Sequence, residues 1–500
     1  MVTENESVRL ILGLKIKTLR QQYGFNLQQL SNVTGIAVSY LHDIEGGKKY
    51  PKADKIITLA RALKVDYDYL VSLTGTKRLQ PIIDLMNSDF MNMIPWEHFG
   101  ITPSSLLDLF SNTPDKVTAF ISTLLKLSRS MQMSKENFYT SALRSFQDLH
   151  DNYFEDLESA SQQFRVKMKL KDAVSVDIGL LATQLQKQFN ISVDRKTLIN
   201  NNILKGLRSF YSPVKKILYL NGDFSPSQEK FLLGRELAFQ FLQLNPRPYE
   251  TILQRPSSFE VLLNNFKASY FTSAILMPED IFAEDIKRIC SLPKWSDKGW
   301  LDLLHKYDVT PEMLMQRLTN ILPRHFGIEQ LFFLRMNSDI ATDHFEMTKE
   351  LHLSQLHNPY ANYLNEHYCR RWIAINTMKD VYEKIKTKKY RHPVIHAQTS
   401  QYYQTHNRYF CFTFAKPQSK ESNIMSSVTI GLLIDSKVLQ ALPFINDHTV
   451  PVRTVNTTCE HCGILDCKER AAAPLWIQKQ EELQRIEEAL QSINGIEGDQ

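Results

Sequence analysis

Apolar side chains recur at the spacing of an α-helix along residues 8–72. The clearest stripes are Ile16, Leu19 and Tyr23, then Ile56, Leu59, Ala60 and Leu63. Spacings of three and four residues place such side chains on one helix face, where they can pack against neighbouring helices. The pattern predicts about five short helices in an all-α domain. A plausible domain boundary follows at residues 75–81, so the domain is expected to cover residues 1–75.

A pair of helices joined by a tight turn is predicted within this domain. Asn26 followed by Gln29 is a capping-box arrangement, in which each side chain can accept a hydrogen bond from the other residue's backbone N–H. A helix is therefore expected to begin at Leu27 and to end at Gly35, which supplies the turn. A second helix is expected over Val38–Glu45.

The second helix has distinct inner and outer faces. Leu41 and Ile44 are expected to pack inward, whereas Ser39, His42 and Asp43 point outward. This is helix-turn-helix geometry, which lays the second helix in the major groove of DNA with its first side chains at base edges.

The charge distribution agrees with nucleic-acid contact by this domain. Residues 1–80 contain twelve Lys and Arg against seven Asp and Glu, so the +5 net charge of the chain lies there and the remainder is neutral. A basic surplus on a small domain is typical of phosphate binding. A solvated basic face would explain the charge alone equally well.

The remaining chain is predicted to form three further regions. Residues 82–170 have the pattern of an amphipathic helical linker or dimerisation region, and residues 172–335 that of an α+β domain with a strand in KKILYLNG. Residues 336–500 are expected to form a mixed α/β domain with strands in RYFCFTFAKP and SSVTIGLLID, followed by a cysteine cluster and a charged terminal helix. The predicted fold class is therefore multidomain.

Composition limits the other possibilities. The chain has 500 residues, of which 43% are hydrophobic and 23% charged, as is ordinary for globular proteins. No apolar run approaches the roughly 18 to 20 residues that cross a bilayer, and the start lacks the pattern of a signal peptide. A cytoplasmic protein without a membrane partner is expected.

Three of the six cysteines, Cys459, Cys462 and Cys467, fall in one short segment. Thiolates at this density select soft or borderline metals, which indicates zinc or an iron–sulfur cluster. The fourth ligand could be His461, giving a Cys3His zinc site, or Cys369 in EHYCRRW. Reduced thiols without metal are the alternative. For the other two cysteines, Cys290 and Cys411, plain packing is expected.

The segment LQQLSNVTGIAVSYLHDIEGGKKYPKADKIITLARAL resembles the Xre/Cro-type helix-turn-helix family, a likeness that covers residues 10–72. Two positions depart from the family, which often has Gln at Leu27 and Ser or Thr at Ala37. The resemblance implies base contacts by Val38, Ser39 and His42. It implies contacts to the DNA backbone by Gln28, Tyr40, Lys48 and Lys49, although the ring of Tyr40 could instead pack on a neighbouring helix.

The middle region resembles the ImmA/IrrE metallopeptidase-like domain through QEKFLLGRELAFQFLQL and the helices that follow. In active members an HExxH motif on the first helix binds zinc with both histidines. The matching residues are Arg235, Glu236, Leu237, Ala238 and Phe239. Arg and Phe cannot replace two neutral imidazoles, so peptide hydrolysis is not expected here.

The former active site could instead hold a ligand. Arg235 is expected to point into it and could bind an anionic group, with Lys205, Arg208 and Tyr270 as further candidates. The alternative is that Arg235 forms an ion pair with Glu236 or another acid and has only a structural role.

The chain as a whole resembles the short-chain fatty acyl transcriptional regulators. The likeness rests on the helix-turn-helix domain, the degenerate middle domain, Cys369–Trp372 and the segment from Cys459 to Ala471. The resemblance implies an acyl-CoA effector and a [4Fe–4S] cluster on Cys369, Cys459, Cys462 and Cys467, with zinc as the alternative.

The whole sequence therefore predicts a non-enzymatic, one-component regulator that binds double-stranded operator DNA as a homodimer or higher oligomer. Two other functions compete with it. The protein could sense redox state or iron with a vestigial ligand pocket, or it could be a protease that cleaves a repressor, against which the missing HExxH argues.

Overall fold

The computed structural model describes residues 4–76, 79–80, 83, 96–100, 135–170, 174–251, 256–353, 366–390, 392–403, 405, 407–418 and 423–493. The chain forms two compact units. The first comprises residues 1–146 and 253–263, and the second comprises residues 147–252 and 264–500.

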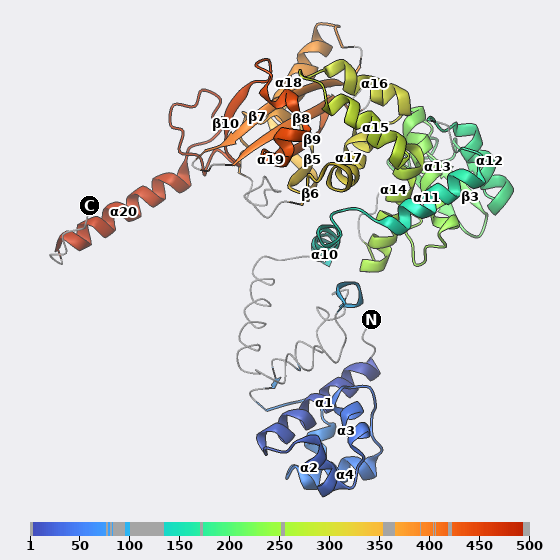
Figure 1. The fold of residues 1–500 in the computed structure, drawn as a ribbon, viewed down its shortest axis with the longest axis vertical. Coiled ribbons are helices and arrows are strands. Elements are labelled where there is room, and N and C mark those ends of the chain that lie inside the picture. The colour runs from blue at the N-terminus through green and yellow to red at the C-terminus, as the bar shows by residue number, and fades with distance from the viewer. Residues whose placement is uncertain are drawn as a thin grey trace. The chain divides into compact units, whose positions relative to one another are not determined.

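Residues 4–76 fold as the five predicted helices (Figure 1). These are α1 (Glu4–Gln22), α2 (Leu27–Thr34), α3 (Val38–Glu45), α4 (Ala53–Ala62) and α5 (Tyr67–Val71). The predicted apolar stripes meet in one core, which includes Ile16, Leu19, Leu30, Leu41, Ile44, Ile56, Leu59 and Leu63. Tyr23 is the exception, because it lies directly after the end of α1 and is 43% exposed. The all-α N-terminal domain is thereby confirmed.

The turn between α2 and α3 forms as the sequence predicts. The Asn26 side chain accepts from the Gln29 backbone N–H at 2.8 Å, and the Gln29 side chain accepts from the Asn26 N–H at 2.8 Å. Gly35 ends α2 with φ of 69°, a left-handed conformation that a residue without Cβ adopts readily. Ala37 precedes α3 and provides no side-chain cap, which the hydroxyl found there in the related family would supply.

Much of the predicted helical linker lies outside the described residues. Of residues 82–170, the structure shows the short helix η1 (Trp96–Phe99) and the helices α10 (Lys135–Leu149) and α11 (Glu155–Lys167). The proposed role of this region in dimerisation stays a prediction.

The second unit contains a small sheet with the strand order β1-β3-β2-β4, in which β1 and β3 are parallel and the other pairs antiparallel. Its strands are β1 (Ser192–Asp194), β2 (Ser209–Ser212), β3 (Ile217–Leu220) and β4 (Glu250–Thr251). The helices of this region are α12 (Ile178–Phe189), α13 (Pro226–Phe241), α14 (Phe259–Leu276), α15 (Glu279–Cys290), α16 (Asp297–Tyr307) and α17 (Pro311–Phe326).

A larger sheet follows with the order β10-β7-β8-β9-β5-β6. Its strands are β5 (Leu331–Asp339), β6 (His344–His352), β7 (Val394–Tyr402), β8 (Arg408–Pro417), β9 (Ile424–Leu433) and β10 (Val452–Val455). Only the β10–β7 pair is parallel among these described strands. The predicted strands in RYFCFTFAKP and SSVTIGLLID are confirmed as β8 and β9.

The remaining elements surround this sheet. They are η2 (Ile340–Thr342), α18 (Ile373–Lys386), α19 (Ser436–Ala441), η3 (Pro443–Asn446) and the terminal helix α20 (Leu475–Ile493), which projects from the sheet in Figure 1. Among the helices that the structure describes, none is long and apolar enough to span a bilayer.

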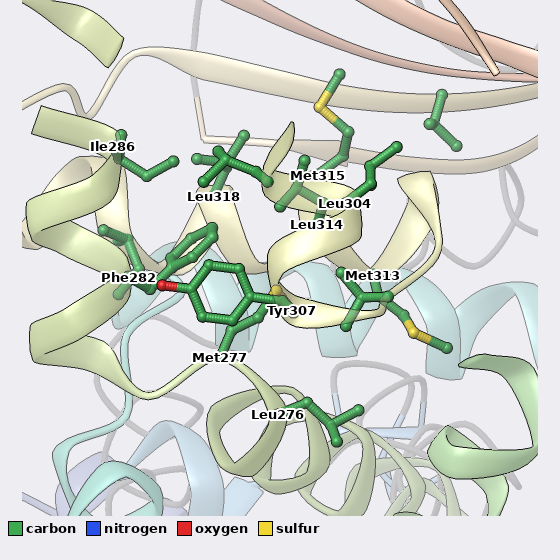
Figure 2. Close-up of a cluster of buried hydrophobic side chains, with 14 of the residues drawn as sticks. Leu276, Met277, Phe282, Ile286, Leu304, Tyr307, Met313, Leu314, Met315 and Leu318 are labelled. Atoms are coloured by element: carbon green, nitrogen blue, oxygen red, sulfur yellow. The ribbon is translucent and has the colours of Figure 1, made fainter. Parts of the chain in front are cut away.

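Helices cover the two faces of the large sheet differently. One face packs on α16 and α17, and α15 packs on these two helices. Figure 2 shows the hydrophobic side chains between the helices, where the rings of Phe282 and Tyr307 meet edge to face at 5.4 Å. The other face packs on α18. The first core continues into the small-sheet region, and β5 crosses the predicted boundary at residue 335, so the middle and C-terminal regions share one interior.

Candidate DNA interface and sensor sites

Helix α3 presents a polar face that can enter a DNA groove. Ser39 and His42 are exposed and lie three residues apart on one side of the helix, while Val38 at its first turn is half-buried. Leu41 and Ile44 are buried on the opposite side. Ser39 and His42 are therefore exposed as base readout would require, while the base contacts themselves stay a prediction.

Three of the residues predicted to contact the DNA backbone are exposed, namely Gln28, Lys48 and Lys49. Gln28 is exposed and its amide donates to Asn32 at 3.1 Å. Lys48 and Lys49 are exposed after α3, and the Lys49 ammonium lies 3.2 Å from the Asp43 carboxylate.

Tyr40 packs on the domain core, and its predicted contact to the DNA backbone stays a prediction. Its half-buried ring packs at the edge of the domain core, as the packing interpretation expects. The same ring lies 5.6 Å from the Lys49 ammonium, so it also attracts one of the two lysines that follow α3.

Helix α1 holds α3 in place. The Arg20 guanidinium binds both Glu45 oxygens, at 2.6 and 2.8 Å, and donates to the Phe25 carbonyl at 2.7 Å. Both side chains of the ion pair are nearly buried. A Cβ at Gly13 would lie 2.6 Å from the Ile44 carbonyl oxygen, so α1 and α3 approach as closely as a glycine permits.

Helix α13 carries the five residues that correspond to HExxH. Glu236, at the position of the catalytic acid, binds the Arg247 guanidinium at 2.6 and 2.8 Å. The same guanidinium lies 3.8 Å from the centre of the Phe239 ring. Arg247 therefore neutralises the carboxylate that a metallopeptidase would use to activate water, and sequence reasoning had not singled this residue out.

Arg235 is buried, but its partners differ from the expected ones. It donates to the Thr251 hydroxyl at 2.8 Å and to the Asn265 amide oxygen, while Glu236 pairs with Arg247 instead. The predicted Arg235–Glu236 pair is therefore wrong, because the two side chains leave α13 in different directions. Burial, followed by the nearby Arg247, lowers the pKa of Arg235 to about 10.

The other ligand candidates do not share one environment. Lys205 is exposed on a loop before β2. Tyr270 is buried, donates to Glu158 at 2.7 Å and accepts from the Phe154 N–H at 3.2 Å. Since Glu158 also binds both terminal nitrogens of Arg317, Tyr270 belongs to a buried polar network.

Arg208 belongs to a cluster of cations around a single carboxylate, that of Glu312. The Lys349 ammonium lies 2.5 Å from Glu312 and the Arg335 Nε lies 3.5 Å from it. Burial alone raises the pKa of Glu312, but Lys349, Arg335 and Arg208 together lower it to about 2.

Sheet register adds a fourth cation. Arg335 on β5 stands directly opposite Lys349 on β6, and Phe414 on β8 lies in the same cross-strand row. Lys416 follows Phe414 by two residues and so shares this sheet face. The pKa of Lys416 is lowered, and burial is the largest cause. Arg335 and Arg208 also lower this pKa, whereas Glu312 raises it. We call Arg208, Glu312, Arg335, Lys349 and Lys416 the cation cluster.

The cysteine segment is paired with residues far away in the sequence. Residues 366–369 run beside 457–461, with an antiparallel bridge between Tyr368 and Thr458 and a Cys369 N–H bond to the Thr457 carbonyl at 3.1 Å. The side chains of Glu366 and His461 meet at 3.0 Å and those of His367 and Glu460 at 2.8 Å.

This pairing brings Cys369 to the cysteine segment. The side chains of Cys369, Cys459 and Cys462 are buried, and Cys467 is half-buried. Burial and the nearby thiols of Cys459 and Cys462 raise the pKa of Cys369 to about 11. His461, the other predicted fourth ligand, instead stacks on Trp476 at 5.2 Å.

Arg470 shapes the cysteine loop by donating to the carbonyls of Cys459 and Cys462 at 2.8 Å and of Ile464 at 2.7 Å. The Ala471 N–H donates to the Cys459 sulfur at 3.4 Å. Sulfur donors suit a soft metal by their chemistry, and Cys369 lies near Cys459 and Cys462. Within the described ranges, no three His, Cys, Asp or Glu side chains stand at metal-binding distances. Cys290 and Cys411 are buried elsewhere, and burial raises the pKa of each to about 12.

Two family descriptions match this chain. Residues 13–76 match the helix-turn-helix domain, and residues 188–319 match the IrrE N-terminal-like domain of the M78 peptidases. An HTH-type transcriptional regulator of Bacillus subtilis, YobD, described as uncharacterized, is 30% identical over 95 residues, which cover 18% of this chain and 83% of that protein. The chain belongs to the helix-turn-helix-type transcriptional regulators.

A second relative extends the likeness beyond the DNA-binding domain. The HTH-type transcriptional regulator PrpR of Mycobacterium tuberculosis is 21% identical over 342 residues, or 65% of this chain and 66% of that protein. A solved Mycobacterium tuberculosis transcriptional regulator superposes with a TM-score of 0.47 and 18% identity, over 66% of this chain and 92% of its own.

Proposed function

We propose that this regulator binds operator DNA through α3 and responds to an anionic, acyl-CoA-type effector at the cation cluster. The cluster carries the proposal because Lys349 and Arg335 lie within 3.5 Å of the Glu312 carboxylate, and Arg208 and Lys416 are close enough to interact with it electrostatically. In a partly buried site, cations that outnumber the carboxylates repel one another. A bound phosphate or pyrophosphate neutralises the excess charge and so stabilises the folded protein.

The position of the cluster suits an effector of this kind. Arg208 and Glu312 come from the region that resembles a metallopeptidase, whereas Arg335, Lys349 and Lys416 stand on the large sheet. A ligand held between these two parts would couple them, because each would contribute charge to the same phosphate group. Ligand binding would then bias their packing, which is the differential contact that effector control requires.

The experiment is calorimetric titration of the full-length protein with acetyl-CoA and propionyl-CoA. Lys416→Met and Arg208→Ala should each weaken binding by about tenfold, since loss of one charge-assisted hydrogen bond corresponds to about 1.5 kcal/mol. Lys187→Met on α12 is the matched control, because Lys187 is exposed outside the cluster. Equal affinity of all three variants and the parent would refute the effector site.

A second proposal concerns the thiols, and it includes the redox- or iron-sensing function. Cys369, Cys459, Cys462 and Cys467 would hold a [4Fe–4S] cluster, with zinc as the alternative, because soft donors from two segments meet there. A bound cluster would supply one-electron redox chemistry. The loop held by Arg470 would orient the thiolates and shield them from water.

Metal analysis and the ultraviolet–visible spectrum of anaerobically purified protein test this site. Iron and sulfide with a broad charge-transfer band support the cluster, and zinc without the band supports the alternative. Cys462→Ser should abolish bound metal, whereas Cys411→Ser should retain it because Cys411 lies in the sheet core. Operator affinity that oxidation alters and acyl-CoAs leave unchanged would favour redox sensing over effector binding.

Helix α20 supports the proposed homodimer. Five of its exposed apolar residues follow a heptad spacing, namely Trp476, Leu483, Ile486, Leu490 and Ile493, whereas the exposed Leu475 lies outside that spacing. Such a stripe is typical of a helix that pairs with a copy of itself. Sedimentation analysis should find a dimer for the parent protein and a monomer for Leu490→Glu. A monomeric parent protein would exclude this dimer.

A further inference from the structure

A cavity of about 990 Å³ lies beside the large sheet, away from the cation cluster. Its walls come from α18, β7, the start of α16 with the residues before it, and the segment that precedes β10. Strand β10 pairs only with Thr399–Tyr402, so among the described residues the first half of β7, through Gln398, has no neighbouring strand on this edge. The cavity occupies that edge.

Two amide side chains line the cavity and are chemically complementary. The Asn376 Nδ2 is buried and has no hydrogen-bond partner among the described residues. The Gln398 side chain is nearly fully buried, and its Nε2 donates to the Ser400 hydroxyl at 2.9 Å and the Arg371 carbonyl at 3.3 Å. Both Gln398 hydrogens are thus used, which leaves Oε1 as its acceptor. The cavity therefore offers an amide donor and an amide acceptor.

Most charged groups that face the cavity are paired within the protein. The Asp380 carboxylate lies 2.8 Å from the His396 ring and 2.7 Å from the Lys384 ammonium, and Arg453 pairs with Glu469. Asp297 and Lys298 have opposite charges and are both exposed. With opposite charges balanced, the cavity favours an uncharged ligand over an anion such as acyl-CoA.

The apolar part of the wall is built around one aromatic side chain. Trp295 lines the cavity and packs on Trp300 at 5.8 Å and on Phe444 at 5.5 Å. Ile373 and Val450 complete the apolar surface. A flat ring could lie against these side chains while its edge reaches the two amides.

We propose that this cavity binds a nucleoside or free nucleobase as a second effector. Nucleobases present hydrogen-bond donors and acceptors side by side on a flat ring, which matches the Asn376 and Gln398 amides beside Trp295. The volume suits a molecule of that size, since small-molecule sites measure about 300 to 1,000 Å³. The proposal is independent of the acyl-CoA site, because the cavity lies at the β7 edge of the sheet and its lining includes no residue of the cation cluster.

The occupant would act close to the cysteine loop. Helix α18, which supplies Asn376, begins directly after Trp372, whose indole N–H donates to the Asn456 carbonyl at 2.7 Å. Cys369 lies three residues before Trp372, and β10 continues from the cavity wall into that same loop. Ordering of α18 by a ligand would therefore restrain the segment that carries Cys369.

Calorimetric titration of the full-length protein with adenosine, guanosine, cytidine and uridine tests the proposal. At least one nucleoside should bind with one site per chain. Asn376→Leu should weaken that binding on the order of tenfold, because the ligand acceptor loses its buried donor. The matched control Asn446→Leu, which changes an exposed asparagine outside the cavity, should bind as the parent does.

Three outcomes would overturn the inference: no nucleoside binds, Asn376→Leu binds as tightly as the parent, or Asn376→Leu abolishes acetyl-CoA binding as well. The last result would show that one ligand occupies both places. Thermal unfolding of Asn376→Leu guards against misfolding, because leucine is close in size to asparagine and removes a buried amide nitrogen that has no partner among the described residues. Its unfolding midpoint should stay near that of the parent while nucleoside binding weakens.

Discussion

Tyr270→Phe separates a structural role from a ligand-binding role for one residue that sequence reasoning placed in an effector pocket. In the structure the Tyr270 hydroxyl donates to Glu158 at 2.7 Å and accepts from the Phe154 N–H at 3.2 Å. Burial and Glu158 raise the pKa of this phenol far above its usual value, so it stays protonated and keeps donating.

The expected loss of stability follows from these two bonds. A hydrogen bond to a charged acceptor contributes about 1.5 to 3 kcal/mol, and a buried N–H left without a partner costs about 1 to 3 kcal/mol. Arg317 still binds both oxygens of Glu158, so the carboxylate keeps its counter-charge. The substitution should therefore lower the free energy of unfolding by about 2 to 4 kcal/mol, because the two effects partly overlap.

Urea unfolding followed by tryptophan fluorescence measures this loss. Four of the five tryptophans lie in the second unit, so the signal reports mainly on the unit that contains Tyr270. A decrease of 3 kcal/mol moves the midpoint by roughly 1 M for a urea slope near 3 kcal/mol/M. Tyr249→Phe is the matched control, because Tyr249 is 41% exposed and should change stability by less than about 0.5 kcal/mol.

The affinity for acyl-CoA is the second measurement, and it tests whether Tyr270 contacts a ligand. Tyr270→Phe should bind acetyl-CoA within twofold of the parent, because its hydroxyl is engaged inside the protein. Unchanged stability together with a tenfold weaker ligand would refute this reasoning and return Tyr270 to the effector site.

Three further predictions concern the DNA-binding domain. Lys48→Ala should reduce the salt slope of operator binding by about 0.9, so that the ratio of parent to variant affinity falls about threefold between 50 and 200 mM salt; an unchanged slope would exclude a phosphate contact. Ser39→Ala with His42→Ala should weaken specific binding by more than about tenfold and non-specific binding little, and equal losses on both DNAs would contradict base readout. Burial lowers the pKa of Lys15 to about 8, so the unfolded chain binds more protons above pH 8 and stability rises with pH. The parent should therefore gain about 2 kcal/mol relative to Lys15→Met between pH 8 and 9.5 in chemical unfolding, and parallel stability curves would contradict this.

Local sequence signals determined the DNA-binding domain. The Asn26–Gln29 capping box and the turn at Gly35 act between residues that are neighbours in the chain, so the bounds of α2 and α3 follow from them. The stripes of apolar residues sit on single helices and for that reason also predicted the core. The loss of both histidines from HExxH could be recognised from the sequence, because it depends only on which residues stand on α13.

Tertiary structure decided the chemistry of the larger unit, because its groups come from elements far apart in sequence. Lys349 meets Glu312 through the register of β5 with β6, and no local pattern in the sequence encodes that register. Arg247 reaches Glu236 from beyond the end of α13, which the spacing of HExxH could not reveal. Cys369 joins the cysteine loop through a bridge that spans ninety residues of chain, and only the folded backbone brings those two segments together.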